Sequence, residues 1–397
     1  MSRILVLGSG AWGTALALSL HRRGGHQITL WAHSPEFAQE IVDARENTLF
    51  LPGFPIPEAI AITGSEAAVA DAEIVVSVVP SEFLRPTLAR IRPHLHPGQI
   101  VVSATKGVED RTFLRMTQVI AASLAETAPQ SAQAAIRSAG QGFSPDTNPD
   151  TDLEVFLEDS APEVSSSGIS PAPRSLYDLY LPIGALSGPS FALEVAQGQP
   201  TAVTVAFEDS GVPGDRSSSL GWDIAARIQH EFSSESLRLY TSTDVIGVEL
   251  GGALKNVIAI AAGIAAGVGL GYNSAAALMT RGIAEITRLA VACGGRRETL
   301  AGLSGAGDLI LTCTGSLSRN RTVGQELGQG RKLPEILLGL GGKIAEGVLT
   351  TRAALGLARQ HNIEMPITEQ MELILNQGKD PREAIKSLML RPGKDEL

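Results

Sequence analysis

Two patterns of hydrophobic positions divide this chain near residue 244. In the first part, short and continuous apolar runs alternate with stretches of helical periodicity at 14–20, 82–91 and 111–123. The apolar runs cover residues 4–7, 27–32, 74–79, 100–103, 183–186 and 202–206. Continuous β-branched runs are typical of strands buried on both faces, and their alternation with helices predicts a parallel, doubly wound sheet.

After residue 244 the strand pattern stops. Helical periodicity covers 253–267, 275–293, 321–329, 346–361, 367–376 and 382–389. The chain of 397 residues is too long for one core. We therefore predict an α/β fold with an N-terminal Rossmann-like dinucleotide-binding domain at 1–243 and a C-terminal all-α domain at 244–397, which carries substrate and catalytic groups.

Residues 126–176 break the alternation. They are rich in Ser, Pro, Ala and acids and lack sustained periodicity, so we interpret them as a low-complexity insertion in a surface connection. The alternative, a docking segment for a partner, stays open. A smaller polar insertion covers about 208–219.

Charge and cysteine content narrow the class of protein. The net charge is −10, and residues 138–173 hold seven acids without Lys or Arg, so the acidity is mostly local and no basic face predicts nucleic-acid binding. Two cysteines cannot build a disulfide framework, which favours a reducing compartment.

We find no apolar run of the roughly 20 residues that span a bilayer and no room for a signal peptide. We expect a cytoplasmic protein and interpret the terminal Lys-Asp-Glu-Leu as chance.

A glycine-rich turn follows the first predicted strand. In Gly8-Ser9-Gly10-Ala11-Trp12-Gly13, Gly8 permits the tight turn, Gly10 lets the backbone approach a pyrophosphate, and Gly13 allows close packing of helix on strand. The free N–H groups of the following helix suit phosphate oxygens. This position between a strand and a helix predicts binding of a dinucleotide cofactor.

The end of the second strand bears on the choice of cofactor. NAD-selective sites usually carry Asp or Glu there, whereas this chain has Trp31, Ala32, His33 and Ser34. Without a carboxylate to repel a 2′-phosphate, NADPH is tolerated beside NADH and is the preferred cofactor in our interpretation. His33 is the candidate contact for that phosphate, an exposed loop histidine being the alternative, and Arg45 is a weaker candidate.

Charged groups downstream suggest the chemistry. Lys106 follows a strand, at the sheet edge where ligands bind, and the small residues of the segment 187–192 suit contact with a cofactor or substrate oxygen. Lys255 lies in a strongly apolar helix, where burial and a second cation such as Lys106 lower a lysine pKa toward the value that a proton shuttle needs. Asp308 at a core edge needs a partner, and Lys255 is a sensible one.

The segment Ser318-Arg319-Asn320-Arg321 adds donors that match phosphate geometry. With these residues in view, the chain resembles the NAD(P)-dependent glycerol-3-phosphate dehydrogenases from residue 4 to about 390, apart from the two insertions. The motifs that carry the resemblance are GSGAWGTALA at 8–17, ATKG at 104–107, SGPSFA at 187–192, GGALKNVIAI at 251–260, GAGDLILTCT at 305–314, SRNR at 318–321 and EG at 346–347.

The resemblance implies roles for particular positions. Catalytic positions are Lys255, as the proton donor or acceptor, with Lys106 and Asp308; no metal is implied. Substrate-binding positions are Lys106, Gly188, Ser190, Lys255, Asp308, Ser318, Arg319 and Asn320. With the glycines of the turn, the cofactor-binding positions are Gly8, Gly10, Ala11, Trp12, Gly13, His33, Lys106, Ala192, Arg319, Ile344 and Glu346.

We therefore expect hydride transfer between NAD(P)H and dihydroxyacetone phosphate, which gives sn-glycerol 3-phosphate for phospholipid synthesis, in a homodimer. One rival hypothesis is a reductase of the same architecture that acts on a hydroxy acid or a ketopantoate-like substrate. Another is a non-catalytic NADPH sensor that regulates a partner through the acidic insertion.

Overall fold

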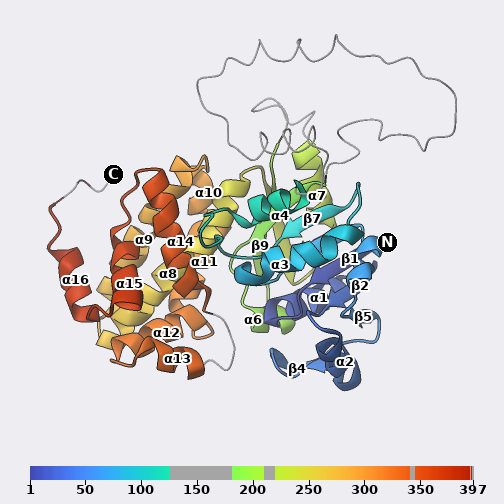
Figure 1. Ribbon diagram of the computed structural model, residues 1–397, viewed down its shortest axis with the longest axis horizontal. Coiled ribbons are helices and arrows are strands. Elements are labelled where there is room, and N and C mark those ends of the chain that lie inside the picture. The colour runs from blue at the N-terminus through green and yellow to red at the C-terminus, as the bar shows by residue number, and fades with distance from the viewer. Residues whose placement is uncertain (126–180, 210–219, 340–344, 394, 396–397) are drawn as a thin grey trace, which may run out of the picture.

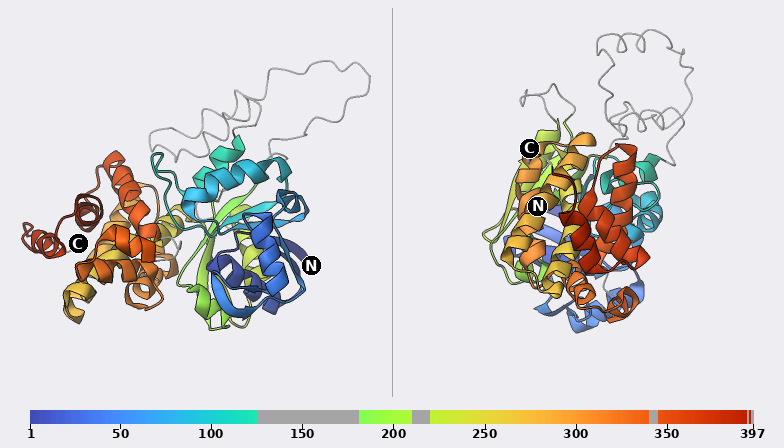
Figure 2. Two further views of the ribbon diagram at one scale, coloured as in Figure 1. Left: turned by 60° about the horizontal axis from the view of Figure 1, so that its bottom comes forward. Right: turned by 90° about the vertical axis from the view of Figure 1, so that its left-hand side faces the viewer.

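The computed structural model describes residues 1–125, 181–209, 220–339, 345–393 and 395 (Figure 1). The predicted insertion at 126–176, most of the smaller one, Ile344, and Lys394, Glu396 and Leu397 of the terminal motif lie outside the described residues. Helices α8 to α16 gather on one side of the molecule, and the sheet with its covering helices forms the other (Figures 1 and 2).

One sheet of eight strands, in the order β10-β9-β8-β7-β6-β1-β2-β5, organises the N-terminal half. Every neighbouring pair is parallel except β8 with β9. The strands are β1 (Ser2–Leu7), β2 (His26–Trp31), β5 (Ile60–Thr63), β6 (Ile74–Ser77), β7 (Ile100–Ser103), β8 (Ile183–Ser187), β9 (Thr201–Phe207) and β10 (Leu237–Ser242). The predicted α/β class is confirmed.

The antiparallel pair β8–β9 corrects the prediction of a fully parallel sheet. The connection between these strands contains one helix, α6 (Ala192–Ala196), of five residues. At about 1.5 Å of rise per residue such a helix cannot carry the chain back along a strand of seven residues. The chain therefore turns and returns alongside β8.

Helices cover both faces of the sheet. Because side chains alternate between the faces of a strand, Ile4 and Val6 pack with α1 (Ala11–Arg23) and α7 (Leu220–Phe232), while Leu5 and Leu7 pack with α3 (Ser81–Ile91) and α4 (Met116–Ala125). Helix α2 (Pro35–Ala44) follows β2, and a small antiparallel pair, β3 (Glu46–Asn47) with β4 (Leu51–Pro55), comes next.

Several predicted bounds are corrected. Helix α4 begins at Met116 rather than at 111, because Arg111 and Phe113 have φ angles of 75° and 59°, which no right-handed helix allows. Strands β5 and β10 were not predicted. They form the two edges of the sheet. In β10 apolar and polar residues alternate, which differs from the continuous apolar run of a central strand, whereas β5 lies in a short apolar run, residues 59–62, that the prediction overlooked.

The C-terminal half is helical throughout its described residues. It contains α8 (Val245–Val268), α9 (Tyr272–Ala292), α10 (Arg297–Ala301), a π-helical turn (Leu303–Gly307), α11 (Asp308–Thr314), α12 (Arg319–Gly328), α13 (Leu333–Gly339), α14 (Glu346–Gln360), α15 (Pro366–Gln377) and α16 (Pro381–Met389). Helix α8 begins eight residues before the predicted 253, so the prediction located the element and missed its first two turns.

Helix α8 is the central element of this half. Among the described residues it alone is long and apolar enough to cross a membrane by length and composition. Because 94% of its most apolar stretch is buried inside the protein, it has the burial of a core helix. Its first turn also packs on the sheet, where Val245 and Val248 meet Ala185 and Ala206.

Glycines let α12 approach α8 closely. A Cβ atom on Gly263 would lie 2.0 Å from the carbonyl oxygen of Arg321, and one on Gly324 would lie 2.0 Å from that of Ile260. No larger residue fits at either point. This backbone contact fixes the start of α12, with Arg319 and Asn320, against the middle of α8.

Candidate active site

The glycine turn between β1 and α1 has the geometry that its sequence predicts. Gly8 has a φ of 121°, and a Cβ atom on Gly13 would lie 1.9 Å from the Gly8 carbonyl oxygen, so both positions require glycine. A Cβ atom on Gly10 would meet nothing within 4 Å. Gly10 is therefore not required by packing, and the space beside it is open to a ligand.

The start of α1 lies at this turn with unsatisfied donors. Gly10 is the N-cap residue and offers no side-chain cap, so N–H groups of the first turn remain for an anion. Ala11 and Trp12 occupy the first two positions, and the Trp12 indole packs against the sheet core. The residues present therefore fit a dinucleotide pyrophosphate.

His33 lies just beyond β2 and is exposed. Its ring contacts Phe37 at 5.7 Å between centroids, and its carbonyl oxygen accepts a hydrogen bond of 3.1 Å from Arg90. No carboxylate follows β2 before Glu36. Among the described residues His33 has no contact with the lysines considered below, so it lies apart from them.

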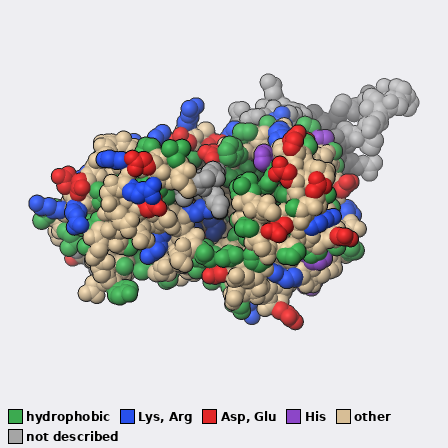
Figure 3. All heavy atoms as spheres, turned by 90° about the horizontal axis from the view of Figure 1, so that it is seen from below, with side chains coloured by type: hydrophobic (Ala, Val, Ile, Leu, Met, Phe, Trp, Pro, Cys, Tyr) green, Lys and Arg blue, Asp and Glu red, His purple; other side chains and the backbone are tan. Residues whose placement is uncertain are grey.

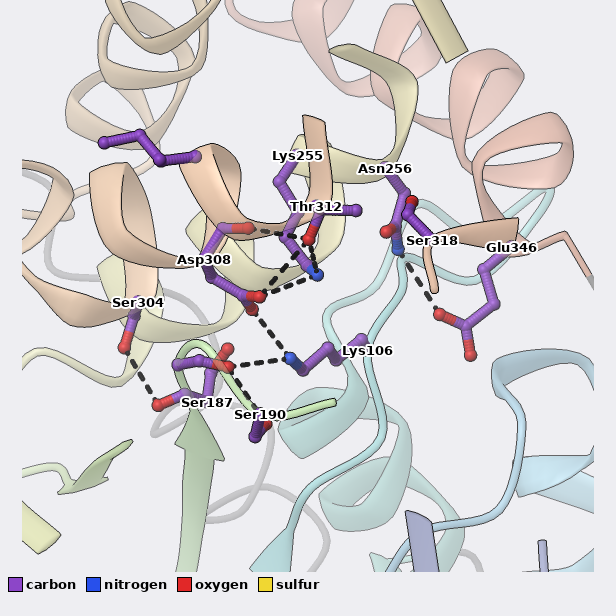
Figure 4. Close-up of polar contacts among 12 residues, drawn as sticks. Lys106, Ser187, Ser190, Lys255, Asn256, Ser304, Asp308, Thr312, Ser318 and Glu346 are labelled. Carbon is purple, nitrogen blue, oxygen red and sulfur yellow. Dashed lines mark hydrogen bonds and ion pairs between the residues drawn. The ribbon is translucent and has the colours of Figure 1, made fainter. Parts of the chain in front are cut away.

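Lys106 and Lys255 converge on Asp308 (Figure 4). Lys106 Nζ lies 2.6 Å from Asp308 Oδ2, and Lys255 Nζ lies 2.8 Å from Asp308 Oδ1. Lys106 comes from the loop after β7, Lys255 from α8, and Asp308 from the start of α11 directly after the π-helical turn. One carboxylate thus holds two ammonium groups from different halves of the chain.

The Lys255 amine is nearly enclosed. Lys255 is 6% exposed and Asp308 1%, and Lys255 Nζ also donates to Thr312 Oγ1 at 2.6 Å. Burial lowers the pKa of Lys255; Asp308 acts in the opposite direction, and the Lys106 charge lowers the pKa further. A lowered pKa brings both protonation states of the lysine closer to neutral pH, which favours a role as a general acid or base.

A second network lies beside the first. Asn256, the neighbour of Lys255 on α8, donates to Glu346 Oε2 at 3.3 Å, and the Gly347 N–H donates to Asn320 Oδ1 at 3.0 Å. Burial raises the pKa of Glu346, while the charges of Lys255, Lys106 and Arg319 act to lower it. The Glu346 carboxyl therefore lies within the field of all three cations.

Ser318, Arg319 and Asn320 are at the N-terminus of α12, not in a loop. Ser318 caps the helix by accepting from the Arg321 N–H at 3.2 Å, and Asn320 is buried. Arg319 is exposed. A guanidinium at a helix N-terminus combines a cation with free backbone donors, which suits a phosphate.

The loop after β8 closes the site from below in Figure 4. The Gly188 carbonyl oxygen accepts from Lys106 Nζ at 3.2 Å and from Ser190 Oγ at 3.0 Å. A Cβ atom on Gly252 of α8 would lie 2.2 Å from Ser187 Oγ, so α8 approaches this loop only because Gly252 has no side chain. Ala192 begins α6, and no polar contact links it to the cluster among the described residues.

Sequence reasoning missed Asn256 and gave Thr312 no role. The role of Asn256 could not be predicted, because no sequence pattern in an apolar helix indicates that the residue next to a lysine makes a polar contact. Thr312 lies one helical turn after Asp308, and its hydroxyl bonds the Asp308 carbonyl oxygen at 2.6 Å. Its spacing of four residues from Asp308 was the available signal, since residues four apart on a helix face the same side.

A hollow between the two halves contains Lys and Arg side chains (Figure 3). Its cationic lining suits an anionic ligand. The geometry thus combines a turn with free backbone donors, a buried lysine whose pKa is lowered by burial and a guanidinium at a helix end.

Comparison with known proteins gives the same family for both halves. The family model described as NAD-dependent glycerol-3-phosphate dehydrogenase N-terminus matches residues 3–135 and 173–212, and the corresponding C-terminus model matches residues 244–386. Two relatives named glycerol-3-phosphate dehydrogenase [NAD(P)+], from Koribacter versatilis and Acidobacterium capsulatum, are each 50% identical over 100% of this chain and 99% and 100% of their own lengths.

A similar solved structure belongs to the same family. The glycerol-3-phosphate dehydrogenase of Coxiella burnetii is 32% identical with a TM-score of 0.78 and covers 98% of this chain and 99% of its own. A ketopantoate reductase from Ralstonia eutropha is 15% identical with a TM-score of 0.50 over 96% of this chain and 99% of its own, so it shares the fold alone.

Proposed function

This chain belongs to the NAD-dependent glycerol-3-phosphate dehydrogenase family, and we propose that its Lys106–Asp308–Lys255 cluster is where dihydroxyacetone phosphate and sn-glycerol 3-phosphate are interconverted. The chain is an NAD(P)-dependent oxidoreductase. The observation that carries the assignment of the site is the convergence of two lysines on one buried carboxylate, 2.6 and 2.8 Å away, next to an arginine at a helix N-terminus.

The cofactor is held by the glycine turn and by groups around the cluster. Gly8, Gly10, Ala11, Trp12 and Gly13 bind the pyrophosphate, and His33 contacts the adenosine ribose or its phosphate. Ala192, Ile344 and Glu346 complete the cofactor side, and Lys106 and Arg319 touch both ligands. When bound, the nicotinamide supplies the hydride for ketone reduction.

The substrate phosphate binds Arg319 and Asn320. Ser318, Gly188 and Ser190 line the same pocket, and Lys106 lies where its ammonium can polarise the ketone oxygen. Fixed cations of this kind stabilise the negative charge that develops on that oxygen in the transition state.

Lys255 moves the proton. In the direction of reduction its ammonium protonates the forming alkoxide, and in the reverse direction its neutral amine accepts the hydroxyl proton. Asp308 holds Lys255 in place and keeps Lys106 at a fixed distance from it. Because burial lowers the pKa of Lys255, both protonation states are accessible closer to neutral pH than for an exposed lysine.

A spectrophotometric assay of NADPH and NADH oxidation tests this proposal. Dihydroxyacetone phosphate should be reduced efficiently, while dihydroxyacetone and ketopantoate should react far more slowly, because neither carries the phosphate that Arg319 and Asn320 are proposed to bind. Equal rates with dihydroxyacetone would contradict the phosphate site. We propose NADPH as the preferred cofactor, and parallel assays with both cofactors test this preference.

The rival of a non-catalytic sensor has no support in the relatives, which are named as dehydrogenases over the full length of this chain. We further propose a cytoplasmic homodimer whose product enters phospholipid synthesis, with 1–243 and 244–397 as its domains. Sedimentation at several concentrations would test the dimer.

A further inference from the structure

We infer that Asn47, a residue outside the motifs considered so far, is a positioning residue that holds the glycine turn in its pyrophosphate-binding conformation. This inference rests on the proposed use of that turn by the cofactor. Asn47 lies in β3, beyond α2, and is fully buried with 0% exposure. The following strand β4 lies near α1 in Figure 1.

Both the nitrogen and the oxygen of the Asn47 side-chain amide are hydrogen-bonded within the protein. Nδ2 donates to the Ser9 carbonyl oxygen at 2.7 Å and to Thr14 Oγ1 at 2.8 Å, and Oδ1 accepts from the Phe50 N–H at 3.1 Å. The Phe50 N–H can only donate and the Ser9 carbonyl can only accept, so these partners fix the orientation of the amide. Asn47 thereby ties the turn to the first helical turn of α1.

The bond to Ser9 determines where the next N–H points. Ser9 and Gly10 share one planar trans peptide, in which the C=O and N–H groups point in opposite directions. Because the Ser9 carbonyl points at the buried Asn47, the Gly10 N–H points away from it. A Cβ atom on Gly10 would meet no protein atom within 4 Å, so there is also free space beside this residue. Asn47 thus aims a backbone donor at the ligand without contacting the ligand.

A buried amide of the same kind offers a matched control. Gln99 is 1% exposed, donates from Nε2 to the carbonyl oxygens of Val69 and Ala72 at 2.7 and 2.8 Å, and accepts from the His96 N–H at 2.8 Å. It therefore makes two donated bonds and one accepted bond, as Asn47 does. It has no contact with the glycine turn among the described residues, so its removal affects stability alone.

The test measures the dissociation constant of NADPH by nicotinamide fluorescence on the full chain, with thermal melting in parallel. Asn47→Leu and the isosteric Asn47→Asp should weaken NADPH binding about tenfold or more, because neither can donate to Ser9. Gln99→Met should lower the melting temperature similarly yet bind NADPH within about twofold of wild type. At saturating cofactor, kcat of the Asn47 variants should stay within about threefold of wild type, since the lysine cluster is untouched.

Thr14→Val separates the two donated bonds, because it removes the hydroxyl acceptor and leaves the bond to Ser9. It should weaken NADPH binding less than Asn47→Asp does. Wild-type affinity in a folded Asn47→Asp protein, or an equal loss in Gln99→Met, overturns the inference. If Asn47→Leu does not fold, Asn47→Asp decides. Failure of the wild-type protein itself to bind NADPH would contradict the proposed function instead.

Discussion

The glycine turn and the lysine cluster, which we propose for the cofactor pyrophosphate and for proton transfer, present different kinds of groups to a ligand. At the turn, the groups available to a ligand are backbone N–H groups. There is no room for side chains, because a Cβ atom on Gly13 would lie 1.9 Å from the Gly8 carbonyl oxygen. At the cluster, the groups available to a ligand are charged side chains. Lys106, Lys255 and Asp308 come from positions up to 202 residues apart. The first site is local in sequence, and the second exists only in the folded chain.

This difference separates affinity for the cofactor from the chemical step. A change at the turn should alter cofactor affinity and leave the proton transfer intact. A change at the cluster should do the reverse.

Lys255→Ala should have the largest effect. Loss of the proton donor should lower kcat by about 10³-fold, within the range for a general acid. The dissociation constant of NADPH should change little, because the amine lies among Asp308 and Thr312, away from the turn. Stopped-flow turnover and NADPH fluorescence measure both quantities, and near-wild-type turnover would remove Lys255 from its role.

Asp308→Asn should come next. The neutral amide no longer holds both ammonium groups at hydrogen-bond distance, and displacement of one catalytic group by about 1 Å can cost about 10²-fold in rate. Steady-state kcat with melting as the control measures this effect. A variant with an unchanged rate would indicate that Asp308 only stabilises the fold.

Arg319→Ala should raise the KM for dihydroxyacetone phosphate by about 10- to 100-fold, since a charge-assisted hydrogen bond contributes about 1.5–3 kcal/mol. Arg321→Ala, two residues along the same helix, is the matched control. Both variants should also be assayed with dihydroxyacetone, which lacks the phosphate, as the substrate. If Arg319→Ala slows both substrates equally, the guanidinium does not bind phosphate.

Gly10→Ala should weaken NADPH binding about tenfold and leave the melting temperature unchanged. Its φ of −69° suits alanine and the added methyl group meets no protein atom, so the only group that it can obstruct is the ligand. Gly13→Ala is the contrast, because its methyl group would overlap the Gly8 carbonyl and should destabilise the fold. A Gly10→Ala protein with wild-type affinity would show that the pyrophosphate does not approach there.

The pH profile gives the smallest and most specific effect. Ketone reduction needs protonated Lys255, so kcat should fall as pH rises through the lowered pKa of Lys255; oxidation needs the neutral amine and should fall as pH drops through it. Lys106→Met removes a charge that lowers this pKa and frees Asp308 for Lys255, so both limbs should move to higher pH. Movement to lower pH would contradict the assignment of the limb to Lys255.

The fold and the turn were predictable because their signals are local. The central strands are continuous apolar runs, and the three glycines of the turn follow one of them. The edge strand β10 was not predicted because its first residues alternate between apolar and polar, while the short apolar run 59–62, which contains part of the other edge strand β5, was overlooked.

At the cluster, residue types were predictable and geometry was not. Lys255 was identified because a lysine is conspicuous in an apolar helix, and Asp308 as its partner followed from the need to compensate a buried charge. That Asp308 also binds Lys106, and that Asn256 bonds Glu346, depends on the packing of α8, α11 and α14. Asn47 has no local signal, because its partners Ser9 and Thr14 lie more than 30 residues away.

The most direct measurement is a crystal structure of the Lys255→Met variant with NADP⁺ and dihydroxyacetone phosphate bound, a pair that cannot react because both molecules are in the oxidised form. The account predicts the phosphate on Arg319 and Asn320, the ketone oxygen facing the side chain at 255 and Lys106, and the pyrophosphate on the glycine turn. A substrate phosphate held elsewhere, with the ketone oxygen turned away from residue 255, would contradict it.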